Sequence, residues 1–145
     1  MILISACLCG VNCKYNGSNN YNEKIKEILE EYEYMLVCPE QLGGLTTPRK
    51  PAEIIKDKVI DNEGKDVTIN FEKGALETLK IAQLTNTKYA LLKEGSPSCG
   101  SNFIYDGNFN GTKILGEGLT AKLLKKNGIK IFSENEIEDL KDKIK

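Results

Sequence analysis

The sequence predicts an α/β fold: a single three-layer domain over residues 1–145, with a mostly parallel sheet, helices on both faces and a small antiparallel excursion. The first reason is that short apolar runs, typical of buried strands, alternate with longer amphipathic segments, typical of helices. The second is length, because 145 residues suit one domain that buries about 70% of its unfolded surface. The third is composition, since 40% apolar and 28% charged residues are normal for a globular protein.

The N-terminal part of the chain predicts a strand, a helix and a second strand. Met1–Ala6 is an apolar run of strand length. Asn22–Tyr32 has the spacing of an amphipathic helix. Its apolar stripe consists of Ile25, Ile28, Leu29 and Tyr32. Tyr34–Val37 is again strand-like, and Pro39 favours an extended Cys38 that ends the run.

The middle of the chain predicts the antiparallel excursion and a helix. Within Pro51–Val67, two apolar pairs flank a charged tripeptide, and the turn residues Asp61–Gly64 follow them. Thr68 is expected to be the N-cap of the next helix. The inward face of that helix is expected to consist of Phe71, Ala75, Leu76 and Leu79.

The C-terminal part predicts two more buried strands with a helix between them. The strands are expected over Tyr89–Leu92 and Ile129–Phe132. The helix is expected over Gly118–Lys126, and Asn127-Gly128 is a common pair at a helix C-terminus.

A last helix is expected after Ser133 and Glu136, which have the spacing of a capping box. Its inward residues are expected to be Ile137, Leu140 and Ile144. Strands separated by helices favour a parallel sheet, in which the loops at the carboxyl ends of the strands form the ligand site. Functional residues are therefore expected in those loops.

Charge and histidine content exclude several classes of function. The chain has 20 basic and 21 acidic side chains and a net charge of -1, which argues against a nucleic-acid or membrane partner. No run approaches the roughly 18 apolar residues of a membrane span. The apolar N-terminal run is also too short for a signal peptide, so a cytoplasmic protein is expected. The absence of histidine excludes Ser-His-Asp and Cys-His catalysis.

Three of the five cysteines fall in the loops that follow predicted strands. Cys7 follows the first strand, Cys38 the second, and Cys99 lies a few residues beyond Leu92. Each one alone could be a small buried apolar residue. Because parallel strands share one carboxyl edge, the three thiols are expected to converge there. Thiolate ligands without histidine suit either zinc or an iron–sulfur cluster, and composition does not choose between them.

Three separated motifs around these cysteines resemble the signature of the thiouracil desulfurase family, and the resemblance runs nearly from end to end. The motifs are Ser5-Ala6-Cys7-Leu8-Cys9-Gly10, Cys38-Pro39-Glu40-Gln41-Leu42-Gly43-Gly44-Leu45 with Thr47-Pro48-Arg49, and Ser96-Pro97-Ser98-Cys99-Gly100-Ser101. Further similar segments are Pro51-Ala52-Glu53-Ile54, Ile104-Tyr105-Asp106-Gly107 and Asn127-Gly128-Ile129-Lys130. The resemblance implies that residues 1–145 form one domain of this kind.

The resemblance implies a non-redox desulfuration that depends on a [4Fe-4S] cluster. Carried over by motif, the cluster ligands are Cys7, Cys38 and Cys99, and one iron keeps no protein ligand. The sulfur of a small thiolated base such as thiouracil, or of another thioamide, would bind that iron. Water would then replace the sulfur and give uracil and sulfide. Soft iron acting on soft sulfur makes this chemistry reasonable.

Five further residues are expected to serve the reaction. Glu40, two residues from a predicted ligand, is the best-placed base to deprotonate water, although it could also be a solvated carboxylate. Ser96 and Ser98 could orient water or substrate, although serine is also common in turns with proline. Arg49, the only arginine, is expected with Ser101 to bind substrate, because its planar fork suits a pyrimidine carbonyl. A structural role for Arg49 is the alternative.

Two alternatives to a desulfurase fit the same cysteines. In the first, the cysteines bind structural zinc in a small binding module without catalysis, and removal of the metal would unfold the chain. In the second, Cys9 or Cys13 carries a persulfide in a sulfur carrier or a redox enzyme. Serine in place of Cys9 or Cys13 would abolish function only in that second case.

Overall fold

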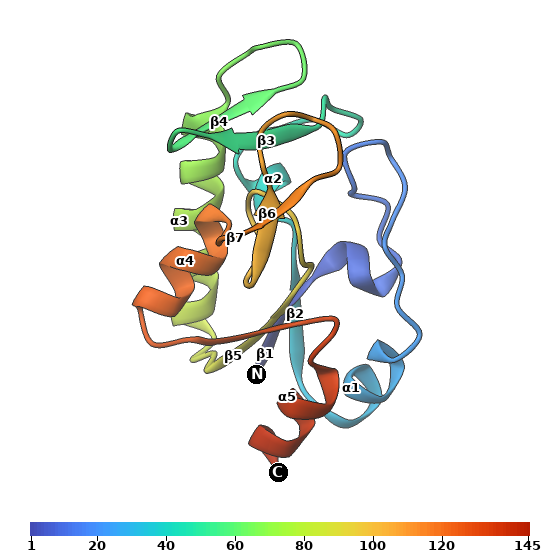
Figure 1. Ribbon diagram of the computed structural model, residues 1–145. Coiled ribbons are helices and arrows are strands. Elements are labelled where there is room, and N and C mark those ends of the chain that lie inside the picture. The colour runs from blue at the N-terminus through green and yellow to red at the C-terminus, as the bar shows by residue number, and fades with distance from the viewer.

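The centre of the molecule, described over residues 1–145 by a computed structural model, is a four-stranded sheet (Figure 1). Its strand order is β2-β1-β5-β8, and all three neighbouring pairs are parallel. The strands are β1 (Ile2–Ser5), β2 (Tyr34–Val37), β5 (Tyr89–Leu92) and β8 (Lys130–Ser133). The predicted parallel sheet is therefore confirmed, with each strand within two residues of its expected bounds.

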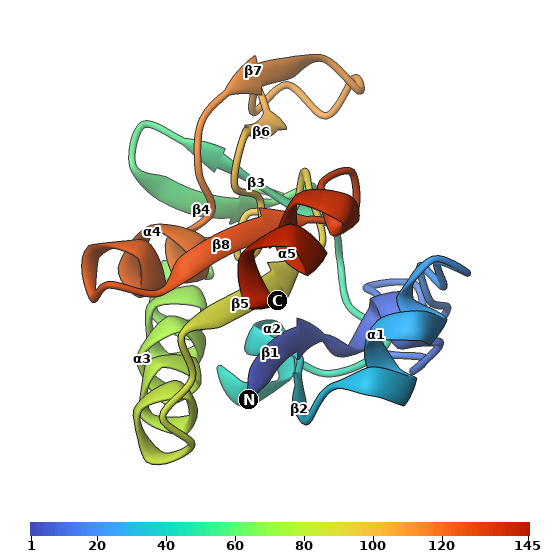
Figure 2. The ribbon, with the colours of Figure 1, turned by 90° about the horizontal axis from the view of Figure 1, so that it is seen from below.

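Helices cover both faces of this sheet, as the alternation of apolar runs and amphipathic segments predicts. They are the 3-10 helix η1 (Ala6–Cys9), α1 (Ile25–Glu31), α2 (Pro39–Leu42), α3 (Thr68–Leu84), α4 (Leu119–Lys126) and α5 (Ile137–Ile144). Figure 2 shows α3 and α4 on one side of the sheet and α1 and α5 on the other. None of these helices has the length and apolar character needed to cross a membrane.

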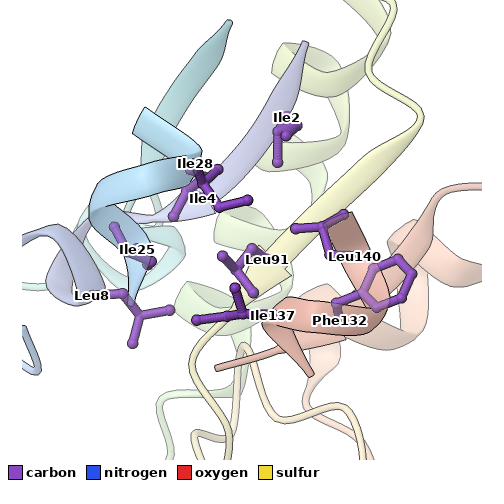
Figure 3. Packing of buried hydrophobic residues seen from close by; sticks show 9 residues of the cluster. All are labelled: Ile2, Ile4, Leu8, Ile25, Ile28, Leu91, Phe132, Ile137 and Leu140. Carbon is purple, nitrogen blue, oxygen red and sulfur yellow. The ribbon is translucent and has the colours of Figure 1, made fainter. Parts of the chain in front are cut away.

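Alternating side chains of the strands build two cores. Ile2 and Ile4 of β1 point to the face covered by α1 and α5, as Figure 3 shows. Leu3, between them, points to the opposite face, where it joins the cluster that contains Ala82 of α3 and Leu124 of α4. Strands buried on both faces explain why β1 is an unbroken apolar run in the sequence.

Two small antiparallel hairpins lie outside the sheet, above its carboxyl edge in Figure 1. The first pairs β3 (Ala52–Ile55) with β4 (Lys58–Asp61) and confirms the predicted excursion. The second pairs β6 (Phe103–Tyr105) with β7 (Lys113–Leu115) and was not predicted. Its strands have three residues each, and β7 is exposed along its whole length. Such a strand has no alternation of buried and exposed residues for a sequence pattern to reveal.

Two expectations for α3 were wrong. Thr68 is the first helical residue rather than the N-cap, which is Val67. The Thr68 hydroxyl instead accepts a hydrogen bond from the backbone N–H of Val59 in β4 (2.9 Å). Leu76 was expected on the inward face but is 54% exposed. Phe71 and Ala75, from the same predicted stripe, are buried as expected, so the apolar stripe is narrower than the pattern suggested.

The C-terminal elements follow the prediction with small shifts. Gly128 takes the left-handed conformation (φ 84°) that favours glycine after a helix. The Ser133 backbone N–H donates to the Glu136 carboxylate (3.1 Å), as in a capping box. The Ser133 hydroxyl accepts from Asn135 rather than from the N–H of Glu136, because α5 begins at Ile137, four residues after Ser133.

Candidate active site

The three predicted ligand cysteines lie around one cavity at the carboxyl edge of the sheet. Neighbouring strands β2, β1 and β5 end at the same level, with Ser5 paired to Val37 and Ile4 paired to Leu91. The chain leaves these ends into the segments that carry Cys7, Cys38 and Cys99. All three line a cavity of about 1030 Å³. Topology therefore brings together thiols that are separated by up to 92 positions in the sequence.

Cys7 lies in η1, directly after β1. Gly10 ends this short helix in the left-handed conformation (φ 92°) and donates its N–H to the Cys7 carbonyl (3.3 Å). The thiol is half-buried, and burial raises the pKa of Cys7. Cys9, two residues on, does not line the cavity, although it was one of the two candidates for a persulfide.

Cys38 is the residue before α2, and its extended conformation (φ -126°) is the one that Pro39 favours. Its Sγ lies 3.8 Å from the backbone carbonyl oxygen of Cys13. A hydrogen bond with the Cys13 side chain, the backbone N–H of Gln41 and the charge of Arg49 lower the pKa of Cys38, against the effect of burial. Cys13 is 2% exposed and lines the same cavity, so a fourth thiol faces the site.

Cys99 is the most enclosed of the three, with 4% of its surface exposed. The Ser5 hydroxyl donates to its Sγ (3.4 Å), and the Ser98 hydroxyl lies at 3.6 Å. Burial raises the pKa of Cys99 to about 12, although these two hydroxyls act in the opposite direction. Hydroxyl donors at a buried sulfur would stabilise a thiolate once a metal centre draws the proton away.

A buried carboxylate holds the loop that carries Cys99. Glu94, 3% exposed, accepts at Oε1 the backbone N–H groups of Ser101 (2.7 Å), Asn102 (2.9 Å) and Phe103 (3.2 Å). Its Oε2 accepts from the Ser101 hydroxyl and the Asn102 side chain. The end of β5 and the far end of the Cys99 loop are therefore joined through one side chain.

The first turn of α4 fixes the same loop from the other side. Its backbone N–H groups, which have no partner inside the helix, donate to carbonyls of the loop. The four bonds run from Gly118 to Gly100 (2.7 Å), from Leu119 to Pro97 (2.8 Å), and from Thr120 (2.9 Å) and Ala121 (3.0 Å) to Ser98. A Cβ on Gly118 would lie 2.6 Å from the Ser98 carbonyl oxygen, so this approach requires glycine.

The structure brings Ser96 and Ser98 together beside Cys99. Their hydroxyl oxygens are 2.8 Å apart. The Ser96 hydroxyl also accepts the backbone N–H groups of Ser98 (3.0 Å) and Cys99 (3.1 Å), which makes it part of a turn. Both serines line the cavity beside Cys99. Ser101 is directed instead to Glu94 and is absent from the cavity wall.

Glu40 and Arg49 form a short, largely enclosed ion pair in the cavity wall. Arg49 Nη2 lies 2.6 Å from Glu40 Oε2, and the side chains are 7% and 18% exposed, respectively. The same Nη2 donates to the Cys13 carbonyl (2.8 Å). Nη1 donates to the Thr47 hydroxyl (2.9 Å) and the Thr46 carbonyl (3.3 Å). Arg49 thus joins three segments of the wall.

The two hairpins form the far wall of the cavity. Glu53 of β3 accepts the backbone N–H groups of Gly107 (2.9 Å) and Phe109 (3.2 Å) and so holds the loop between β6 and β7 over the site. Tyr105 and Phe109 line the cavity from this side. The wall therefore offers aromatic surface opposite the thiols.

The thiols of the cavity wall do not form a site for a single metal ion. No three His, Cys, Asp or Glu side chains lie close enough together to hold a single metal ion, so the arrangement does not match a mononuclear zinc site. Three cysteine thiols from three separate segments nevertheless face one cavity, and thiolates are the ligands that iron–sulfur clusters take.

Comparison with known proteins decides the family. Residues 2–136 match the model of the 2-thiouracil desulfurase family. The chain belongs to this family. Its fold matches the solved structure of the [4Fe-4S]-dependent thiouracil desulfidase TudS (DUF523Vcz), with a TM-score of 0.93 and 41% identity over 99% of this chain and 96% of that one. It is also 47% identical to the Bacillus subtilis (strain 168) protein YbbK, over 97% of this chain and 99% of YbbK.

The 2-thiouracil desulfurase motifs thus meet at one site, and two residues there, Glu94 and Glu53, were missed from the sequence. Glu94 has a visible signal, because it is a carboxylate two residues beyond a predicted buried strand. Glu53 has a second, because it stands inside a segment that resembles the family. Cys13 was considered from the sequence only as a persulfide carrier, and the structure places it, buried, in the cavity wall.

Proposed function

We propose that this protein is a [4Fe-4S]-dependent desulfidase that removes sulfur from a thiolated pyrimidine such as thiouracil. The observation that carries the proposal is the convergence of Cys7, Cys38 and Cys99 on one cavity in a chain 41% identical to a protein described as a [4Fe-4S]-dependent thiouracil desulfidase. The reaction converts C=S and water to C=O and hydrogen sulfide, with no net oxidation or reduction.

Cys7, Cys38 and Cys99 would hold the cluster as thiolates. With only three protein ligands, the cluster would supply a Lewis-acidic iron for the thiocarbonyl sulfur. The lower pKa of Cys38 favours its thiolate, and the hydroxyls of Ser5 and Ser98 can donate to the Cys99 sulfur. Rigid loops around each thiol favour retention of a large prosthetic group.

Glu40 is the proposed general base. It lines the cavity two residues from Cys38. Its Oε2 is paired with Arg49, whereas its Oε1 has no hydrogen-bond or ion-pair partner. That oxygen can take a proton from the water that attacks the thiocarbonyl carbon. The paired hydroxyls of Ser96 and Ser98 can pass hydrogen bonds to water or substrate beside Cys99. The departing sulfide then takes up the proton.

The cavity suits a small planar base. Its volume of about 1030 Å³ exceeds what one pyrimidine ring needs, and Tyr105 and Phe109 offer aromatic surface on the wall opposite the thiols. Substrate binding by Ser101 stays a prediction. In this structure the Ser101 hydroxyl donates to Glu94 (3.3 Å). The net charge of -1 favours a small substrate over a long nucleic acid.

Anaerobic reconstitution with iron and sulfide tests the proposal. The chain should turn brown and bind about four irons, and uracil should form from 2-thiouracil. Serine in place of Cys7, Cys38 or Cys99 should lower the iron content and abolish uracil release. The control is Cys9→Ser, which removes a thiol that does not line the cavity and should keep both properties. A colourless wild-type chain that refuses iron would refute the proposal.

A further inference from the structure

We propose that Arg49 is a positioning residue that holds Glu40 in its catalytic orientation and ties it to the loop that faces Cys38. This inference rests on the proposed function, in which Glu40 is the base. It departs from the expectation that Arg49 binds substrate.

The first argument is that the terminal donors of Arg49 are used within the protein. Its two Nη atoms carry four N–H groups, and they make four contacts with Glu40, Cys13, Thr47 and the Thr46 carbonyl. With 7% of the side chain exposed, the guanidinium has little capacity left for a substrate. An arginine that bound a pyrimidine carbonyl would need a free pair of donors directed into the cavity.

The second argument is the geometry of the shared nitrogen. Nη2 donates both to Glu40 Oε2 (2.6 Å) and to the Cys13 carbonyl (2.8 Å). The Cys38 Sγ lies 3.8 Å from that same carbonyl oxygen. One nitrogen therefore connects the proposed base with the backbone that faces a proposed cluster ligand. A short charge-assisted bond of this kind restricts the Glu40 rotamer.

The third argument is that lysine cannot replace this arrangement. An ammonium group is a single donor centre, whereas the guanidinium fork reaches Glu40, Cys13 and Thr47 at the same time. A lysine side chain at this position could keep the charge beside Glu40 but would release the loop contacts. Arg49→Lys should therefore recover part of the function that Arg49→Ala loses.

The test is a kinetic double-mutant cycle on the reconstituted full chain with 2-thiouracil. Arg49→Ala should lower kcat by about 10- to 100-fold, part of the 10²–10⁴-fold contribution of a general base, and change KM by less than about threefold. Arg49→Lys should lie between Arg49→Ala and the wild type. In a Glu40→Gln background, Arg49→Ala should cost less than about a further twofold, because the two residues act as a unit.

The control is Lys80→Ala, which removes the cation of an exposed pair with Glu77 that does not line the cavity. Its kcat should stay within about twofold of the wild type. That result would show that loss of one positive charge alone does not explain the lower kcat of Arg49→Ala. Iron content and melting temperature are measured for every variant, and Arg49→Lys serves if Arg49→Ala fails to fold. A tenfold rise in KM at unchanged kcat, or full additivity with Glu40→Gln, would overturn the inference.

A readout without turnover separates this inference from the proposed function. The ¹³C resonance of the Glu40 carboxyl group should shift in Arg49→Ala and Arg49→Lys and stay in place in Lys80→Ala. An unshifted resonance refutes the positioning role even in an active enzyme. If the wild type binds iron but releases no uracil, the proposed function is refuted. A Glu40 resonance that still shifts in the Arg49 variants then leaves the contact between Arg49 and Glu40 standing.

Discussion

Replacement of Glu94 by glutamine should destabilise the fold by about 2–4 kcal/mol. The carboxylate accepts five hydrogen bonds, three from backbone N–H groups at Oε1 and two from side-chain donors at Oε2. A glutamine keeps one oxygen for the backbone donors. Its amino group, however, would replace the oxygen that accepts from the Ser101 hydroxyl and the Asn102 amide, and the Asn102 NH2 group has no capacity to accept in return. Hydrogen bonds to a charged group contribute about 1.5–3 kcal/mol each, so losing one and weakening the others gives the estimate.

Urea unfolding of the chain without cluster measures this effect. The control is Glu77→Gln, which breaks an exposed pair with Lys80 and should cost less than about 0.5 kcal/mol. A loss below about 1 kcal/mol for Glu94→Gln would show that the loop does not depend on the carboxylate.

The pH dependence supplies a second measurement. Burial alone would raise the pKa of Glu94, but hydrogen bonds from Asn102, Phe103 and Ser101 outweigh it and hold the pKa below its ordinary value of 4.5. The stability that Glu94 contributes is therefore complete above about pH 4.5 and is lost as the pH falls through its lower folded value. The wild type should lose this contribution in acid, whereas Glu94→Gln should lack that part of the pH dependence.

Three further predictions concern packing and surface charge. Gly74→Ala should destabilise by about 1–3 kcal/mol in urea unfolding, because its Cβ would lie 2.0 Å from the Pro39 carbonyl oxygen and push α2 away from α3; an unchanged midpoint would contradict that contact. Thr120→Val should be neutral or stabilising by up to about 1 kcal/mol, because the buried hydroxyl has no hydrogen-bond partner; a loss above 1 kcal/mol would reveal one. Lys141→Ala should change the melting temperature only slightly, since Glu27 and Glu138 are exposed, and any change should shrink in high salt.

Much of the sheet could be predicted from the sequence because each strand is a short apolar run, and the central strands β1 and β5 are buried on both faces. β2 and β5 coincide with the apolar runs that predicted them. The hairpin β6–β7 could not be predicted, since three exposed residues carry no periodic signal. Leu76 shows the opposite error, because an apolar residue at helical spacing is 54% exposed. Periodicity records which residues can be buried, whereas packing decides which ones are.

For the candidate site, the sequence identified the thiols and missed what holds them. Cys7, Cys38 and Cys99 follow strands, and parallel topology is enough to bring such positions to one cavity. The contact between Glu40 and Arg49 joins residues nine positions apart, across a loop whose course no local pattern fixes. The ties between Glu94 and residues 101–103 depend in the same way on the path of a loop. Contacts of this kind come from the folded chain and not from spacing.

The bonds between α4 and the Cys99 loop also bear on the order in which the molecule matures. Cys7 and Cys38, two of the three proposed cluster ligands, lie within the first 38 residues to be synthesised. The third acquires its backbone partners only when residues 118–121 have been made, because their N–H groups anchor the carbonyls around Cys99. The proposed cluster site is therefore incomplete in the nascent chain for most of its synthesis. Delivery of iron and sulfide to the proposed centre would accordingly be a late, near-terminal event in biogenesis.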